Sequence, residues 1–142
     1  MMPRVDFYIT NNTGRNGQLL LACRVTEKAY QLGNSIYIRA DTPNQASQID
    51  DLLWTFKQGS FIPHGRQGDN DTNNPVVIGY DQSEPDKPSD VLINLTNDIP
   101  AFYKKFERVA EVIGTDEPAR KSARERYRLY REQGCELNTH NV

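Results

Sequence analysis

The chain has 142 residues, of which 37% are hydrophobic and 25% are charged, and its formal net charge is −2. This length predicts a single domain, residues 1–142, with a substantial core. The slight negative charge argues against a general affinity for nucleic-acid phosphates. No apolar run approaches the roughly 20 residues of a membrane-spanning helix, and the first residues lack the apolar segment of a signal peptide. Cys23 and Cys135 have no metal-type spacing, so we expect reduced thiols in a cytoplasmic protein.

Patterns of apolar residues predict strands and helices in alternation. Thr42, Pro43 and Gln45 form a helix start, with a capping residue, a proline at the first helical position and a glutamine that completes a capping box. The predicted strands cover residues 5–10, 35–40, 75–80, 91–95, 108–113 and 135–139, and the predicted helices cover residues 16–32, 43–59, 98–106 and 116–133. This order predicts a three-layer α/β/α fold with a mainly parallel central sheet, Rossmann-like in type.

The segment between Trp54 and His64 lies at a helix end and in the loop that follows it. It contains the single tryptophan of the chain, two phenylalanines and Ile62. Large apolar side chains in a loop either fill a core or form a landing site for a partner, and tryptophan is enriched at binding hot spots. Composition leaves both alternatives open. Residues 65–74 and 81–90 are polar and are predicted to be loops.

Residues 116–133 predict the helix with the best-defined ends. Acidic residues and Pro118 occupy its first turn, and Gly134 follows its last turn. Six basic residues against four acidic ones give this segment a charge of +2, so the rest of the chain sums to −4. Spacings of three and four residues define one face of the helix, with Arg128 beside it. That face consists of Arg120, Arg124, Tyr127 and Arg131.

Two interpretations of this cationic face are open. A row of arginines that includes an aromatic ring suits an acidic partner that also carries an apolar group. Alternatively, the segment is a solvated last helix whose tyrosines pack onto the core, since runs of charge usually face solvent.

The sequence lacks the common signatures of an enzyme. Residues 13–17 contain two glycines but neither the third glycine nor the lysine of a phosphate-binding loop, so they predict a turn and no nucleotide site. His64 and His140 are far apart, which predicts no zinc site. Cys23 lies within a helix, without groups that would lower the pKa of its thiol, and the carboxylates are distributed over predicted loops. An enzyme stays possible, but nothing in the sequence points to a catalytic site, a metal or a cofactor.

Five short segments, in order and at matching distances, resemble the chi subunit of bacterial DNA polymerase III holoenzyme. These segments are Leu53-Trp54, Ser60-Phe-Ile-Pro-His64, Asp90-Val-Leu-Ile-Asn-Leu95, Ala123-Arg-Glu-Arg-Tyr-Arg128 and Leu137-Asn-Thr139. The resemblance implies a non-enzymatic connector within the clamp-loader assembly, with a fold similar to nucleotide-binding proteins but no use of a nucleotide. It also implies contact with DNA only through other proteins, and no membrane association.

The resemblance further implies two partners, the psi subunit and the C-terminal tail of single-stranded-DNA-binding protein. That tail is acidic and ends in an apolar residue that bears the α-carboxylate. By resemblance, Arg124 captures the carboxylate, Tyr127 and Ile113 surround the apolar side chain, and Arg120 and Arg128 hold the other acidic residues.

The psi surface implied by the same resemblance consists of Trp54, Phe61 and Pro63, and a helicase-like alternative partner would share it. Two rival functions stay open. Arg128, Arg131 and Tyr127 could bind single-stranded nucleic acid directly, although the net negative charge argues against this. An enzyme that uses a nucleotide is suggested by fold analogy alone.

Overall fold

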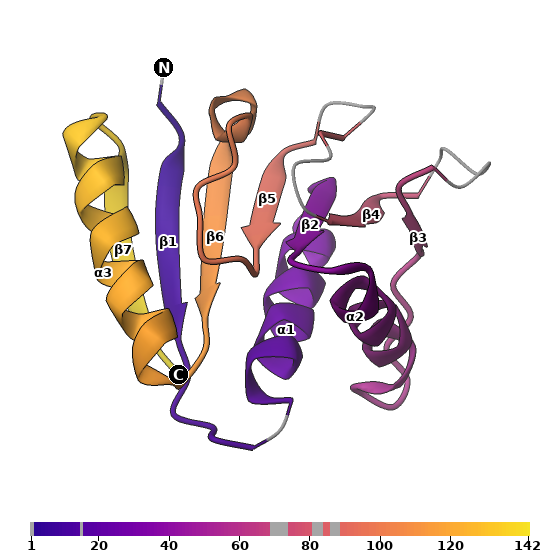
Figure 1. Cartoon of the computed structure of the whole chain (residues 1–142). Coiled ribbons are helices and arrows are strands. Elements are labelled where there is room, and N and C mark those ends of the chain that lie inside the picture. Colours follow the sequence, from indigo (N-terminus) through magenta and orange to yellow (C-terminus); the bar gives the residue numbers. More distant parts are fainter. Residues whose placement is uncertain (1, 15, 69–73, 81–83, 86–88) are drawn as a thin grey trace.

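The computed structural model describes residues 2–14, 16–68, 74–80, 84–85 and 89–142 of the chain (Figure 1). Seven strands form one sheet, in the order β3-β4-β2-β5-β6-β1-β7, and every neighbouring pair is parallel. The strands are β1 (Arg4–Ile9), β2 (Ile36–Ala40), β3 (His64–Arg66), β4 (Val76–Tyr80), β5 (Val91–Asn94), β6 (Arg108–Ile113) and β7 (Glu136–Asn141). The predicted α/β fold with a parallel sheet is confirmed.

The helices cover the two faces of the sheet. Helices α1 (Gly17–Gln31) and α2 (Pro43–Thr55) pack on one face, and α3 (Glu117–Glu132) packs on the other, over the end formed by β6, β1 and β7 (Figure 1). Because side chains alternate along a strand, Ile36 and Ile38 of β2 enter the core beneath α1 and α2, whereas Tyr37 enters the other core. No helix in the described ranges has the length and apolar character needed to cross a membrane.

The predicted helix ends are formed by the expected groups. The Thr42 hydroxyl accepts a hydrogen bond from the Gln45 amide at 3.1 Å. The Asp116 carboxylate likewise accepts one from the Ala119 amide at 3.2 Å, which caps α3. Gly134 follows α3 with φ of 90°, a left-handed conformation that glycine adopts without steric cost.

Three predictions about elements were wrong in detail. Strand β3 lies at the start of the segment predicted as the 65–74 loop; it is short, polar and at a sheet edge, so it carries no apolar pattern. The predicted 98–106 helix is a single 3₁₀ turn, η1 (Tyr103–Lys105), and α2 ends at Thr55 instead of continuing to residue 59. The loops predicted at 65–74 and 81–90 otherwise fall partly outside the described residues.

Candidate functional site

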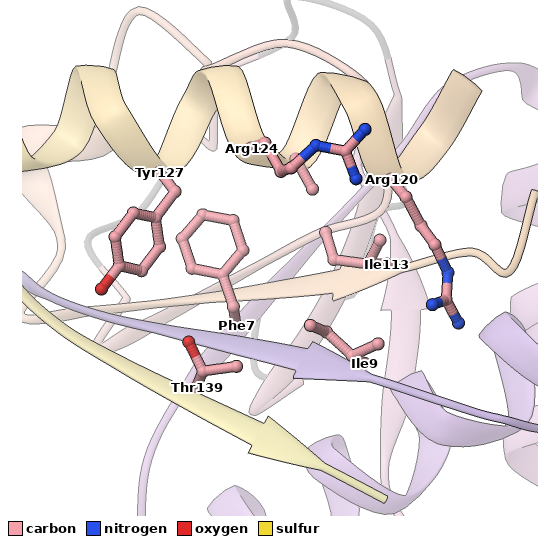
Figure 2. Close-up of a pocket in the computed structure, with 8 residues that line it drawn as sticks. Phe7, Ile9, Ile113, Arg120, Arg124, Tyr127 and Thr139 are labelled. Atoms are coloured by element: carbon pink, nitrogen blue, oxygen red, sulfur yellow. The ribbon is translucent and has the colours of Figure 1, made fainter. Parts of the chain in front are cut away.

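A pocket of about 360 Å³ lies between α3 and the edge of the sheet (Figure 2). Its floor comes from the strands and its roof from the helix, so the N-terminal strand β1 meets the consecutive elements β6, α3 and β7 there. The lining residues are Phe7, Ile9, Ile113, Arg120, Ala123, Arg124, Tyr127 and Thr139.

The interior of the pocket is apolar. Phe7 and Ile113 are 2% and 3% exposed and belong to the core beneath α3. The Tyr127 ring is half-buried and packs against the Phe7 ring, with 5.4 Å between the ring centroids. Tyr127 therefore forms a wall of the pocket, while Tyr130, the next tyrosine of α3, is fully buried. Tyr130 packs into the core, as the second interpretation of this helix predicts, whereas Tyr127 lines the pocket, so the first interpretation stays a prediction.

Two arginines flank the apolar interior. Arg120 donates a hydrogen bond from Nη2 to the Thr10 carbonyl at 3.3 Å, and its Nε is buried without a hydrogen-bond partner among the described residues. The Arg124 side chain is 65% exposed and donates from Nη2 to Glu117 at 2.9 Å. An exposed pair of this kind contributes about 0–1 kcal/mol, so an incoming carboxylate could replace Glu117 at little cost.

Of the five residues predicted to bind a tail peptide, four line this pocket. The exception is Arg128, which lies outside the lining; its Nε is 3.9 Å from a Glu132 oxygen, one helical turn onward. Arg131 is also exposed and outside the lining. The predicted cationic face is thus split between arginines at the pocket and arginines farther along α3.

A buried charge network behind the pocket was missed by the sequence analysis. Arg126 and Glu111 are 4% and 0% exposed, and Arg126 Nη2 donates to Glu111 at 3.1 Å. The Tyr130 hydroxyl donates to the same carboxylate at 2.7 Å, and the Asn94 amide donates to both of its oxygens. Burial and the adjacent Glu111 carboxylate raise the pKa of the Tyr130 hydroxyl far above its usual range. This network fixes α3 to β6 and so sets which α3 side chains face the pocket.

The expectation that carboxylates lie in loops was wrong, because all three helices carry acidic residues and two carboxylates are buried within strands. Glu111 is within β6, and Asp6 is within β1 and fully buried. Asp6 accepts hydrogen bonds from Arg108 at 2.6 Å, from His140 at 3.2 Å and from Arg4 at 3.1 Å. Burial opposes ionisation of Asp6, but these donors outweigh it and lower its pKa. The sequence feature that could have identified Asp6 and Glu111 was an acidic residue between apolar residues of a predicted strand.

A second polar network occupies the carboxyl ends of β2 and β5, near the centre of the sheet. Arg39 is 1% exposed and donates to Thr96 at 2.6 Å and to Asp98 at 2.8 Å. Burial of Asp98 opposes ionisation, yet Arg39 and Thr96 lower the pKa of its carboxyl. Open α/β sheets often bind ligands at this edge; here Arg39, Thr96 and Asp98 bond to one another.

The segment between Trp54 and His64 divides into two groups. Ile62 is 1% exposed and fills the core under α2, whereas Trp54 and Phe61 are 51% and 65% exposed, with 5.5 Å between their ring centroids. Pro63, which directly precedes β3, is half-buried. His64 is buried and holds the loop, with Nδ1 2.6 Å from the Ile62 carbonyl oxygen. Core filling is therefore confirmed for Ile62, whereas Trp54 and Phe61 are exposed, as a landing site for a partner would require.

A second hollow, of about 310 Å³, adjoins this aromatic pair. It lies between the end of α1 and the loop after α2, and it is more polar than the α3 pocket. Ser60 donates from its hydroxyl to Glu27 at 2.5 Å, and Lys57 lies 3.4 Å from the same carboxylate. The Ser60 hydrogen bond, with help from Lys57, lowers the pKa of Glu27.

Neither cysteine is placed for reactivity. Both thiols are free and buried, and burial raises the pKa of Cys23 to about 12. Within the described ranges, no group of three or more histidine, cysteine or acidic side chains is arranged to hold a metal ion.

These features define a parallel α/β protein with an arginine-flanked apolar pocket at one sheet edge and an exposed aromatic pair near the other. The chain belongs to the DNA polymerase III chi subunit (HolC) family, which it matches over residues 2–138.

Three curated relatives, each named DNA polymerase III subunit chi, are similar to the chain over nearly its whole length. The protein of Pseudomonas aeruginosa is 38% identical over 141 residues, covering 99% of this chain and 98% of the relative. That of Haemophilus influenzae is 29% identical over 143 residues, covering 100% and 99%. That of Escherichia coli (strain K12) is also 29% identical over 143 residues, covering 97% of each chain.

Proposed function

We propose that this protein is a non-catalytic, cytoplasmic accessory subunit of the DNA polymerase III clamp-loader complex. It would bind the acidic tail of single-stranded-DNA-binding protein in the α3 pocket and the psi subunit through the surface of Trp54, Phe61 and Pro63. Family membership supports the place in the holoenzyme. The observation that carries the binding role is the apolar pocket flanked by Arg120 and Arg124.

The geometry suits a peptide that ends in an apolar residue. Its last side chain would enter between Phe7, Tyr127 and Ile113, where burial of apolar surface contributes about 25 cal/mol per Å². The α-carboxylate of that residue would accept hydrogen bonds from the exposed Arg124 guanidinium, and the Arg120 side chain, which also lines the pocket, would add positive charge. Guanidinium groups bind carboxylates through parallel, charge-assisted hydrogen bonds, so one residue would supply both the apolar and the anionic contact.

The psi surface is supported by the exposed aromatic pair. Trp54 and Phe61 are large, exposed and held by a buried framework of Ile62 and His64. Such rigid aromatic groups carry much of the binding energy at protein interfaces. The surface lies on the α2 side of the sheet and the pocket lies on the α3 side, which would allow both partners to bind at once. A helicase-like partner using the aromatic pair would compete with psi.

Direct binding of single-stranded nucleic acid is the weaker alternative. Stacking needs an exposed aromatic face, whereas Tyr127 is half-buried against Phe7. The net charge of −2 also opposes a phosphate-tracking surface. A gel-shift experiment with a bare oligonucleotide separates the two functions, because the adaptor should shift the oligonucleotide only when single-stranded-DNA-binding protein is present.

The test of the proposal is a titration with a fluorescent peptide of the tail, at low and at high salt. We expect saturable binding that weakens with salt, because exposed charges are screened over roughly 10 Å at 0.1 M. The matched control peptide lacks the terminal apolar residue and should bind much more weakly. Equal affinity for both peptides would refute the pocket assignment, and binding of neither would refute the tail-binding role.

A further inference from the structure

The outer edge of β7 is an unpaired strand edge beside the pocket. Strand β7 is the last in the sheet and pairs with β1 on one side, while no described residue forms a strand on its other side. Its side chains are mostly exposed. Unpaired edges offer a row of backbone donors and acceptors to another chain.

The hydrogen bonds at the end of β7 identify the outward-facing backbone groups. The Val142 amide donates to the Ile9 carbonyl at 2.9 Å, and the Val142 carbonyl accepts from the Asn11 amide at 3.2 Å. Because successive residues of a strand point their backbone groups to opposite sides, the even-numbered residues of β7 bond to β1. The backbone N–H and C=O groups of the odd-numbered residues, Leu137, Thr139 and Asn141, therefore face outward.

The same odd-numbered residues direct their side chains toward α3. Thr139 pairs with Phe7 in the sheet register, and both line the pocket. Figure 2 shows Thr139 on the near side of the pocket, with α3 above it. One residue thus contributes a side chain to the pocket and free backbone groups to the sheet edge beside it, so the two binding surfaces are continuous.

We propose that the peptide segment preceding the captured terminal residue adds to the outer edge of β7 as an eighth strand. This inference rests on the proposed binding of an acidic tail peptide. Alternate side chains of the added strand would face α3, where Arg124, Arg128 and Arg131 are exposed, so an acidic segment is complementary there. The pocket alone holds about one residue of the peptide; the strand edge accounts for the binding of residues before it.

Backbone amide exchange followed by NMR tests the inference on the unaltered protein. In the free protein the amides of Leu137, Thr139 and Asn141 should exchange fast, and those of Asn138, His140 and Val142 slowly. Saturating tail peptide should slow at least two of the three outward amides by about 10-fold or more, as expected for newly hydrogen-bonded groups. Bound peptide with unchanged exchange at all three would overturn the inference and leave the pocket assignment intact.

Peptides with single backbone N-methyl groups give an independent test. In an added strand only every second N–H of the peptide points at β7. N-methylation at those positions should weaken binding about 5-fold or more, whereas the same change at intervening positions, which serve as matched controls, should leave affinity within about 2-fold. Equal effects at adjacent positions would overturn the strand addition. Failure of the unmodified peptide to bind would instead refute the proposed function, so the two failures are distinguishable.

Discussion

Arg124 and Arg126 are two residues apart on α3, yet their environments are opposite. Arg124 is 65% exposed and bonds to an exposed glutamate, whereas Arg126 is 4% exposed and bonds to a buried one. Both are cationic positions in the same basic helix, so composition does not separate them. The difference shows that the basic residues of α3 lie in two environments: the inner arginine fixes the helix on the sheet, and the outer ones present their charge to solvent.

The largest effect should come from the inner arginine. Arg126→Met keeps most of the side-chain volume but leaves the Glu111 carboxylate buried without its charge partner. Breaking a buried pair in this way typically costs about 3–5 kcal/mol of the free energy of unfolding. Urea unfolding followed by circular dichroism measures it.

The double variant Arg126→Met/Glu111→Leu tests the cause of that loss. With both charges removed, no unpaired charge is buried, so part of the lost stability should return, although Tyr130 and Asn94 lose an acceptor. A loss below about 1 kcal/mol in the single variant, which is within the range of exposed pairs, would show that the network does not anchor α3.

The outer arginine should affect binding instead of stability. Arg124→Ala should reduce affinity for the tail peptide by about 1.5–3 kcal/mol, the range for a hydrogen bond to a charged group, and should change the free energy of unfolding by less than about 0.5 kcal/mol. Peptide titration and urea unfolding of the same preparation give both values. Lys121→Ala, at an exposed basic residue of α3 outside the pocket lining, is the matched control and should have the smaller effect. Equal effects of the two variants would contradict the geometry of the pocket.

Much of the fold could be predicted from the sequence. The features that could not be predicted were missed for physical reasons. The capping residues Thr42 and Asp116 act locally, so the helix starts were predictable, as was the central apolar strand β5. Arg126 and Glu111 are 15 positions apart in the sequence and are paired by the packing of α3 on β6, which helical periodicity does not encode. Strand β3 was missed because a three-residue edge strand has no apolar pattern.

The arrangement of the candidate site was predictable in part. Helical spacing placed Arg120, Arg124 and Tyr127 on one face, and the structure brings all three to the pocket. Phe7 and Thr139 were not predicted, because the position of β7 beside β1 depends on the topology of the whole sheet. The division between Ile62 and Phe61 likewise required knowledge of which side of the loop faces the core.

A third prediction concerns Asp6, whose carboxylate is buried within β1. The folded-state pKa of Asp6 lies below its usual value, so its ionised form contributes stability above the unfolded-state pKa of about 3.9, and that contribution is lost as the pH falls through the folded-state pKa. Wild-type stability should therefore decline below about pH 4, and Asp6→Asn should remove that part of the decline while lowering stability at pH 7. Urea midpoints between pH 3 and pH 7 measure this. Parallel profiles of the two proteins would contradict the shift.

The last prediction concerns Phe61, for which we expect a small change in stability. Exposed Phe61 and buried Ile62, in the loop after α2, differ in the same way as Arg124 and Arg126. Phe61 is 65% exposed, so Phe61→Ala should change the free energy of unfolding by less than about 0.5 kcal/mol. Under the proposed function it should nevertheless weaken binding of psi at least about 10-fold, because exposed aromatic anchors dominate such interfaces. Its neighbour provides the matched control: Ile62→Ala creates a cavity in the core and should cost about 2–5 kcal/mol of stability. If Phe61→Ala leaves psi binding unchanged in a pull-down with purified subunits, the exposed aromatic pair is not the psi surface, and the α3 pocket remains as the separately tested site.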